Sequence, residues 1–293
     1  MDKVLGNKKH IAVFVLPAFL IFFTFVLIPI GYNVLLSFQK TDLMSPGEFV
    51  GIRNYMNLLN DRTFKKALQN NIFMVIGSLI AHLPLAILFG NILFQKIKGS
   101  HFFQTVFFLP CILGGVAVGL TWTFIYNSEF GLLNKFLGMV GLENLQKVWL
   151  AEKNLALLCI IIVVMWQFVG YHMMIQLAAM KNIPESYYEA ARIDGASKWV
   201  QFRSITFPLI KPILKVDAVL IIIGSLKYYD LVAVMTAGGP NHATEVMSTY
   251  MFYQGFRTLK YGYSSSIGVV LLILCVCAVA LSNFVFRTEN IEY

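Results

Sequence analysis

Charged side chains are scarce in this sequence. Of its 293 residues only 13% are Asp, Glu, Lys or Arg, whereas 58% are hydrophobic, and the mean hydropathy is +0.70. A soluble domain carries roughly 25% charged residues, and a chain with far fewer cannot cover its surface with polar groups. The composition therefore excludes a soluble globular protein and indicates a protein embedded in lipid. It also excludes a disordered chain, since aromatic residues make up 14% of the sequence.

Several signatures of other functions are missing as well. The sequence has only four cysteines, all within apolar runs, where they act as small hydrophobic residues and not as a disulfide framework or zinc site. His82 and His172 have no further ligand near them in the sequence, so we expect no metal site and no catalytic residues. No G-x-x-x-x-G-K-[ST] segment is present to cradle ATP phosphates. The net charge of +8 does not indicate a nucleic-acid partner, because the basic residues are dispersed.

Long apolar runs are abundant. A helix needs roughly 20 mostly apolar residues to cross a bilayer core about 30 Å thick, and six stretches qualify. The fifth differs from the others, because it carries charged residues towards both ends and is apolar only in its centre. We expect an all-α polytopic membrane protein with six transmembrane helices, at about 11–37, 68–94, 102–126, 155–180, 208–231 and 264–286.

The same runs predict the domain organisation and the topology. We expect one transmembrane domain over 11–293 after a tail of residues 1–10. The three lysines of this tail favour a cytoplasmic N-terminus, and an even number of spans then places the C-terminus, from Arg287 on, in the cytoplasm too. Counted over all loops, eleven basic residues fall on each predicted side, so charge alone does not set the orientation.

The longest predicted cytoplasmic loop, 181–207, has the signals of a helix-turn-helix. Pro184 suits the first turn of a helix, since it lacks an N–H that has no partner there, and Glu185 favours the positive end of the helix dipole. Gly195 can end the helix in a left-handed conformation, and a second short helix is expected from Ser197. The small and charged residues of the first helix indicate contact with another protein.

This loop resembles a known motif. Glu189-Ala190-Ala191, then Gly195, then Ile205-Thr206-Phe207-Pro208 are spaced as in the EAA-x3-G-x9-I-x-L-P motif of ATP-binding-cassette (ABC) import permeases, with Phe207 in place of Leu. In a further passage, Thr236 to Pro240, Ala237 stands where the family usually has Gly. The passages that resemble the carbohydrate-uptake, maltose-type branch are Phe49-Val50-Gly51-Ile52-Arg53-Asn54-Tyr55, Phe107-Phe108-Leu109-Pro110, Phe130-Gly131-Leu132-Leu133-Asn134 and Thr236-Ala237-Gly238-Gly239-Pro240.

The resemblance implies the type I ABC importer permease fold with a cytoplasmic EAA coupling helix. It assigns coupling to Glu189, Ala190, Ala191, Asp194 and Gly195, which would dock on a separate ATPase dimer. ATP and Mg²⁺ would bind there, so no cofactor is expected on this chain. It also implies a second homologous permease, and it favours a heterodimer over a homodimer. An extracellular solute-binding protein would deliver the substrate, and the complex would lie in a bacterial plasma membrane. The plainer alternative is an ordinary amphipathic helix at the membrane interface.

Candidate substrate contacts lie on the fourth and fifth spans, from which maltose-type permeases draw sugar contacts. Polar groups in membrane helices usually face a cavity or a partner. Gln167 and Tyr171 are four residues apart on one helix face, and Ser225 and Tyr228 share a face of the next span. Each has an alternative, since the tyrosines can belong to the interfacial aromatic belt and Ser225 can bond its own helix or allow close packing.

The other ionisable residues of the fifth span are expected to be structural. Lys227 and Asp230, three residues apart, favour an ion pair at the outer boundary. Asp217 is expected to pair with Lys211 or Lys215, or to reach the region of the motif.

Together these features predict the permease subunit of an ATP-driven, binding-protein-dependent importer of sugars, oligosaccharides above all, that works by alternating access with a partner ATPase. An importer for another solute such as glycerol phosphate stays open, since Lys227 could meet an anion. An ion-coupled secondary carrier is the alternative from another class, but it needs buried carboxylates near the midplane, and Asp217 and Asp230 lie towards span ends. A membrane enzyme such as a lipid-linked transferase would need paired acids that the spans lack.

Overall fold

The computed structural model describes residues 8–285 apart from 43, 45 and 96. Residues 1–7 of the expected N-terminal tail and the expected C-terminal tail from Arg287 lie outside the described residues. The described chain is mostly helical and divides into two compact units. One unit holds the described residues of Met1–Asp61 and Met251–Leu272, and the other holds those of Arg62–Tyr250 and Ile273–Tyr293.

The first part of the chain is a long apolar helix followed by a short hairpin. Val13–Ser37 is long and apolar enough to cross a membrane. In the hairpin Gln39 pairs with Phe49 in an antiparallel register. The side-chain amide of Asn54 donates to the carbonyl oxygens of Ser37 and Gln39 at 2.8 and 2.9 Å, which fixes the hairpin at the end of the helix. The elements are α2 (Lys8–Phe22), the π-helix η1 (Phe23–Leu27), α3 (Ile28–Ser37), β1 (Gln39–Lys40), β2 (Glu48–Phe49) and α4 (Arg53–Asn60).

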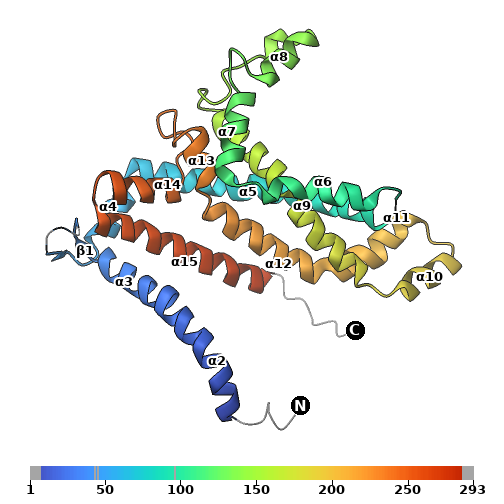
Figure 1. Ribbon diagram of the computed structural model, residues 1–293, viewed down its shortest axis with the longest axis horizontal. Coiled ribbons are helices and arrows are strands. Elements are labelled where there is room, and N and C mark those ends of the chain that lie inside the picture. The colour runs from blue at the N-terminus through green and yellow to red at the C-terminus, as the bar shows by residue number, and fades with distance from the viewer. Residues whose placement is uncertain (1–7, 43, 45, 96, 286–293) are drawn as a thin grey trace. The chain divides into compact units, whose positions relative to one another are not determined.

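The larger unit is built on three helices that pack along one another, α5, α9 and α12 (Figure 1). Helix α6 packs on α9, and α7 packs on α13. The elements from Arg62 on are α5 (Arg62–Phe94), α6 (Ser100–Ile112), α7 (Gly115–Ile125), α8 (Leu132–Met139), the 3-10 helix η2 (Glu143–Leu145), α9 (Ala156–Lys181), α10 (Glu185–Ile193), α11 (Lys198–Gln201), the π-helix η3 (Phe202–Thr206), α12 (Phe207–Leu226), α13 (Asp230–Met235), α14 (Met247–Phe252), the π-helix η4 (Tyr253–Arg257) and α15 (Tyr261–Val285).

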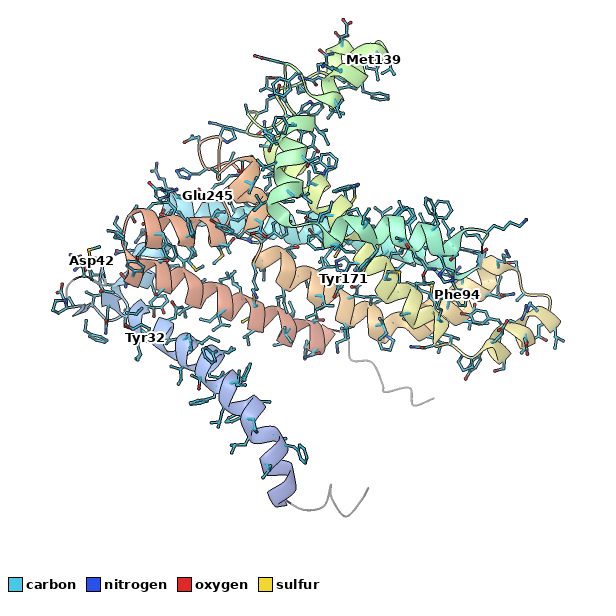
Figure 2. The ribbon with its side chains drawn as sticks, viewed as in Figure 1. Tyr32, Asp42, Phe94, Met139, Tyr171 and Glu245 are labelled. Carbon is cyan, nitrogen blue, oxygen red and sulfur yellow. The ribbon has the colours of Figure 1, made fainter. Side chains whose placement is uncertain are left out.

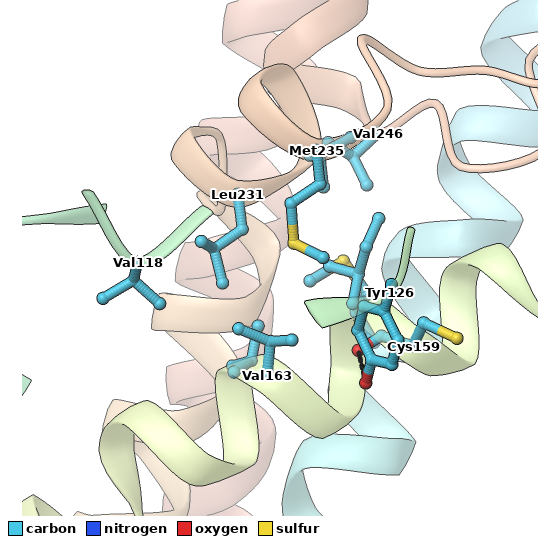
Figure 3. Close-up of a cluster of buried hydrophobic side chains, with 11 residues drawn as sticks. Val118, Tyr126, Cys159, Val163, Leu231, Met235 and Val246 are labelled. Atoms are coloured by element: carbon cyan, nitrogen blue, oxygen red, sulfur yellow. Dashed lines mark hydrogen bonds between the residues drawn. The ribbon is translucent and has the colours of Figure 1, made fainter. Parts of the chain in front are cut away.

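An apolar cluster joins α7, α9 and α13 in this unit (Figure 3). Val118 of α7, Val163 of α9 and Leu231 of α13 belong to this cluster and are buried. Cys159 belongs to the same cluster as a free thiol, in the role of a small hydrophobic residue. The α9 members of the cluster lie in the first part of the helix, before its buried polar residues Gln167, His172 and Gln176.

The third expected span, 102–126, is not one straight helix. Helices α6 and α7 are bent by 97° relative to each other at a break of two residues (Figure 1). Gly114 and Gly115 are weak helix formers and follow Pro110, which explains why the helix breaks there. By length and apolar composition, four described helices can cross a membrane, or five if α6 and α7 form one broken span.

The fifth expected span, 208–231, is also shorter than predicted. Helix α12 ends at Leu226, and the short α13 begins only at Asp230. Helix α12 is not among the helices that qualify as spans by composition, because it carries Lys211, Lys215 and Asp217. The structure thus shows a helical, multi-span protein, and the number of six spans stays a prediction.

Candidate functional site

Helix α10 ends in the way its glycine predicts. Gly195 adopts a left-handed conformation with φ +74°. Its N–H donates to the carbonyl oxygen of Arg192 at 3.1 Å, and the N–H of Ala196 donates to that of Ala191 at 2.9 Å. These two bonds form a Schellman motif, which satisfies carbonyl groups at the helix end and turns the chain sharply towards α11.

Tyr188 anchors α10 to the rest of its unit. Its hydroxyl lies 2.9 Å from Oγ1 of Thr206, just before α12, and its ring packs at 5.5 Å from the ring of Phe94 at the end of α5. Partial burial raises the pKa of Tyr188, while the hydrogen bond to Thr206 opposes that shift. The hydroxyl therefore stays protonated at neutral pH, and the contact is a neutral hydrogen bond.

The opposite face of α10 is exposed. Glu189, Ala190, Asp194 and Gly195 are all exposed, and Ala191 is half-buried. The apolar side chain of Ile193, 87% exposed, lies beside them. Sequence reasoning treated Ile193 only as part of the helix, and its exposure became visible only in the structure. An apolar residue among small and charged ones on an exposed helix is typical of a protein contact surface.

Gln167 on α9 is buried and joins three segments. Its Nε2 donates to the carbonyl oxygen of Leu113 at 3.1 Å, a group that lies in the break between α6 and α7. Its Oε1 accepts from the hydroxyl of Tyr228, just after α12, at 3.3 Å. The side chain is only 2% exposed. Gln167 and Tyr228, two of the four predicted substrate contacts, thus touch each other beside the bend.

The other two predicted substrate contacts lie elsewhere. Tyr171 lies on α9 (Figure 2). It is 37% exposed, and its ring meets that of His172 edge-on at 5.2 Å. Ser225 is buried, and its carbonyl oxygen accepts from Nδ2 of Asn71 at 3.2 Å. Among the described contacts, none joins Tyr171 or Ser225 to Gln167. The shared face that the sequence predicted for Gln167 and Tyr171 does not give them the same environment, because α6 covers Gln167.

Two asparagines at the start of α5 organise the segments that follow α12, and sequence reasoning missed them. Nδ2 of Asn70 donates to the carbonyl oxygens of Ala243 and Glu245 at 2.9 and 2.8 Å. Asn71 accepts from the N–H of Met247 at 2.8 Å and donates to Ser225 and to Leu226. Two adjacent amides at the edge of an apolar run were the available signal, since such groups need partners when buried.

The loop before α14 contains a strained residue. Ala237 has a φ of +49°, in the left-handed region that favours glycine. Glycine, which the family motif that the sequence resembles has at this position, adopts this conformation without strain. Gly238, which follows, has no room for a side chain, because a β-carbon there would lie 2.8 Å from Cδ of the buried Glu245.

Asp217 has partners that the sequence did not predict. The expectation was Lys211, Lys215 or the region of the motif. In the structure both carboxylate oxygens are bound from α9, Oδ1 by Nδ1 of His172 at 2.7 Å and Oδ2 by Nε2 of Gln176 at 2.6 Å. These contacts are long-range in sequence, so helix spacing alone could not reveal them.

His82 and His172 are likewise not isolated from each other. Their rings lie 4.9 Å apart, with His82 on α5 and His172 on α9. Within the described residues, no group of three His, Cys, Asp or Glu side chains is placed to hold a metal ion. The pair therefore belongs to a buried polar cluster with Asp217 and Gln176.

The expected ion pair of Lys227 and Asp230 is absent from the described structure. Both residues are exposed. Asp230 instead lies against the start of α7, where a β-carbon on Gly115 would be 2.9 Å from its Oδ2. A carboxylate is stabilised there by the positive end of the helix dipole, which explains its position.

Comparison with known proteins shows one consistent family. The description "Binding-protein-dependent transport system inner membrane component" matches residues 64–288. The chain is 38% identical over 289 residues to the probable ABC transporter permease protein YurN of Bacillus subtilis (strain 168), covering 98% of this chain and 99% of the relative. It is 31% identical to the lactose transport system permease protein LacF of Rhizobium radiobacter, covering 94% and 93%.

The fold is also found among solved structures. A chain in the crystal structure of a bacterial alginate ABC transporter, in complex with an alginate pentasaccharide-bound periplasmic protein, aligns with a TM-score of 0.84. The alignment covers 97% of this chain and 96% of that one at 21% sequence identity. At this identity the likeness shows the fold, and it extends over both compact units.

Proposed function

Because this chain belongs to the family of binding-protein-dependent transport system inner membrane components, we propose that it carries sugars, oligosaccharides above all, as half of a translocation path. It is a permease of an ABC importer, and ATP hydrolysis takes place on a separate subunit. The sugar assignment is supported by relatives such as the lactose permease over nearly the whole chain. In this proposal the chain spans the cytoplasmic membrane, which the family description as an inner membrane component supports, with both termini in the cytoplasm.

The exposed face of α10 is the single observation that carries the mechanism. In this proposal Glu189, Ala190, Ala191, Asp194 and Gly195 dock on a cytoplasmic ATPase dimer, and closure of that dimer moves the helices that border the loop. The small residues allow close approach of a partner backbone, and the Schellman ending keeps α10 short and rigid. A second, homologous permease completes the path, and an extracellular binding protein delivers the sugar.

Uptake into vesicles tests this function. Proteoliposomes that contain this chain with its second permease and its ATPase are expected to take up labelled maltotriose only with ATP inside and the binding protein outside. Omission of the ATPase is expected to abolish uptake, because the chain has no phosphate-binding loop of its own. If a protonophore abolished uptake while ATP stayed intact, the protein would instead be an ion-coupled carrier. If the vesicles took up glycerol phosphate but no sugar, glycerol phosphate would be the substrate in place of the sugar.

Tyr171 provides a test of the substrate path. Its ring is partly exposed, so we expect Tyr171→Ala to fold normally and to raise the sugar concentration for half-maximal uptake by about tenfold, through loss of a stacking surface worth about 1 kcal/mol or more. Tyr171→Phe keeps the ring and is expected to stay within about twofold. Equal half-maximal concentrations in wild type and Tyr171→Ala would place Tyr171 in the aromatic belt and outside the path.

A further inference from the structure

Three polar side chains tie α9 to α12 inside the larger unit. They are His172 and Gln176 of α9 and Asp217 of α12, and we refer to them as the α9–α12 tie. The carboxylate of Asp217 is fully buried and accepts one hydrogen bond on each oxygen, at 2.7 Å from His172 and 2.6 Å from Gln176. The ring of His82 on α5 packs against that of His172 at 4.9 Å.

Apolar side chains alone could hold these helices together. Ionisable residues within membrane helices are costly and are retained where they face a partner or a function. Asp217 also disqualifies α12 as a simple apolar span, so its presence weakens insertion of the helix. A hydrogen-bonded carboxylate constrains its neighbours more than a methyl group does, because each hydrogen bond holds only over a narrow range of distance and angle.

The tie lies between the two functional regions of the unit. Gln176 is five residues before the end of α9, and Asp217 is ten residues after the start of α12, so both helices run from the tie to the loop that carries α10. An apolar cluster of Met180, Ile183 and Ile210 lies between the tie and that loop. In the other direction along α9, Gln167 lies five residues before His172.

We propose that His172, Gln176 and Asp217 are positioning residues for transport, which hold α9 and α12 in one register so that movement of α10 reaches the contact between Gln167 and Tyr228. This inference rests on the proposed coupling function. Met, Ile and Leu contacts tolerate sliding of one helix along another. A slide by the rise of one residue, about 1.5 Å, would break both bonds of the tie and leave a buried carboxylate without partners.

The test measures sugar taken up per ATP hydrolysed in proteoliposomes of the complete transporter. The triple variant His172→Phe, Gln176→Leu, Asp217→Leu replaces the tie by apolar side chains of similar size, which often preserves folding. We expect it to assemble, to keep stimulated ATP hydrolysis within about twofold, and to lose about tenfold in uptake per ATP, a usual size for a coupling between two sites. A purely structural role would lower uptake and hydrolysis together and leave their ratio unchanged.

Two further variants distinguish loss of the hydrogen bonds of the tie from loss of the carboxylate charge and from a general effect of substitution in the bundle. Asp217→Asn can accept from Gln176 and donate to His172, so it is expected to keep the ratio within about twofold of wild type. Ser78→Ala is the matched control, because Ser78 is buried in the same helix bundle and its hydroxyl has no hydrogen-bond partner among the described residues. It is expected to leave the ratio unchanged.

The outcomes distinguish this proposal from the proposed function. If the triple variant keeps the wild-type ratio, or Asp217→Asn loses as much as the triple variant, the positioning role is overturned. Should the triple variant fail to assemble, Gln176→Leu removes one bond of the tie and is expected to lower the ratio by about threefold, and an unchanged ratio overturns the role. A wild-type transporter that hydrolyses ATP and moves no sugar would overturn the proposed substrate, and the ratio would then be measured with the solute that it does move.

Discussion

Replacement of Gly195 by valine is expected to lower substrate-stimulated ATP hydrolysis by the assembled transporter about tenfold or more while leaving the permease folded. Gly195 has φ +74°, and no atom lies within 4 Å of where its β-carbon would be. The substitution therefore causes no clash and acts only on the backbone. A β-branched residue in this conformation costs about 1–3 kcal/mol, and each 1.4 kcal/mol or so is a tenfold change in population.

The physical consequence falls on the end of α10. A residue that leaves the left-handed region breaks the two hydrogen bonds of the Schellman motif, from Gly195 to Arg192 and from Ala196 to Ala191. The helix end and the direction of the chain into α11 then change, and the exposed residues Glu189 and Asp194 no longer present one surface. We expect stimulated hydrolysis and uptake to fall by about tenfold or more, as measured in proteoliposomes.

Gly141 supplies a closely matched control. It has the same φ of +74° and equally free space around its β-carbon, but it lies between α8 and η2, far along the chain from the loop of α10. Gly141→Val should cost similar backbone strain and leave stimulated hydrolysis intact. Equal losses in the two variants would trace the defect to strain in general, and full stimulation in Gly195→Val would contradict a coupling role for this loop.

Gly170→Ala is expected to destabilise the folded permease strongly. Gly170 lies on α9 where α6 crosses it, and a β-carbon there would overlap the carbonyl oxygen of Phe107. The obstacle is backbone, so rotation of a side chain cannot relieve it. Overpacking of this kind costs about 3 kcal/mol, which lowers a thermal unfolding midpoint by about 5 °C in a protein of this size.

The unfolding midpoint in detergent, read from the monodisperse fraction after heating, measures this effect. Gly224→Ala is the control, since Gly224 is also a helical glycine but its β-carbon would meet nothing within 4 Å. Alanine is the better helix former by about 1 kcal/mol, so this variant should unfold at the same temperature or higher. If Gly170→Ala unfolded at the wild-type temperature, α6 and α9 would not approach as closely as the structure shows.

The helix and turn of the 181–207 loop could be predicted because the information for them is local, whereas the coupling role of this loop stays a proposal. The end of a helix at Gly195 depends on which residue tolerates a left-handed conformation, and only neighbouring residues decide that. The same holds for α5 and α9, whose long apolar runs place their ends within a few residues of the prediction, apart from an earlier start of α5 at Arg62.

The broken third span shows where local reasoning stops. Pro110, Gly114 and Gly115 are visible in the sequence, but the run 102–126 is mostly apolar. Hydropathy therefore indicates a span and does not indicate that the helix axis bends within it. The bend is completed by Gln167 on another helix, which binds the carbonyl group of Leu113 that the break exposes. No spacing within either segment indicates that contact.

The partners of the buried polar groups depended entirely on tertiary structure. His172 and Asp217 are 45 residues apart, and Asn70 binds the backbone more than 170 residues away. In an apolar interior every polar group must find a partner, but the sequence states only that need and not which group meets it.

The sequence by itself determined that the protein lies in lipid, that it is helical, that it carries the family motif, and where α10 begins and ends. Hydropathy, helix propensity and glycine conformation are properties of single residues and their near neighbours. Only the tertiary structure decided that Gln167 meets Tyr228 at the bend and that Asp217 is held from α9. Those contacts arise because α5, α9 and α12 pack along one another and bring together residues that are distant in sequence. Such packing depends on how the side chains of the whole bundle fit together.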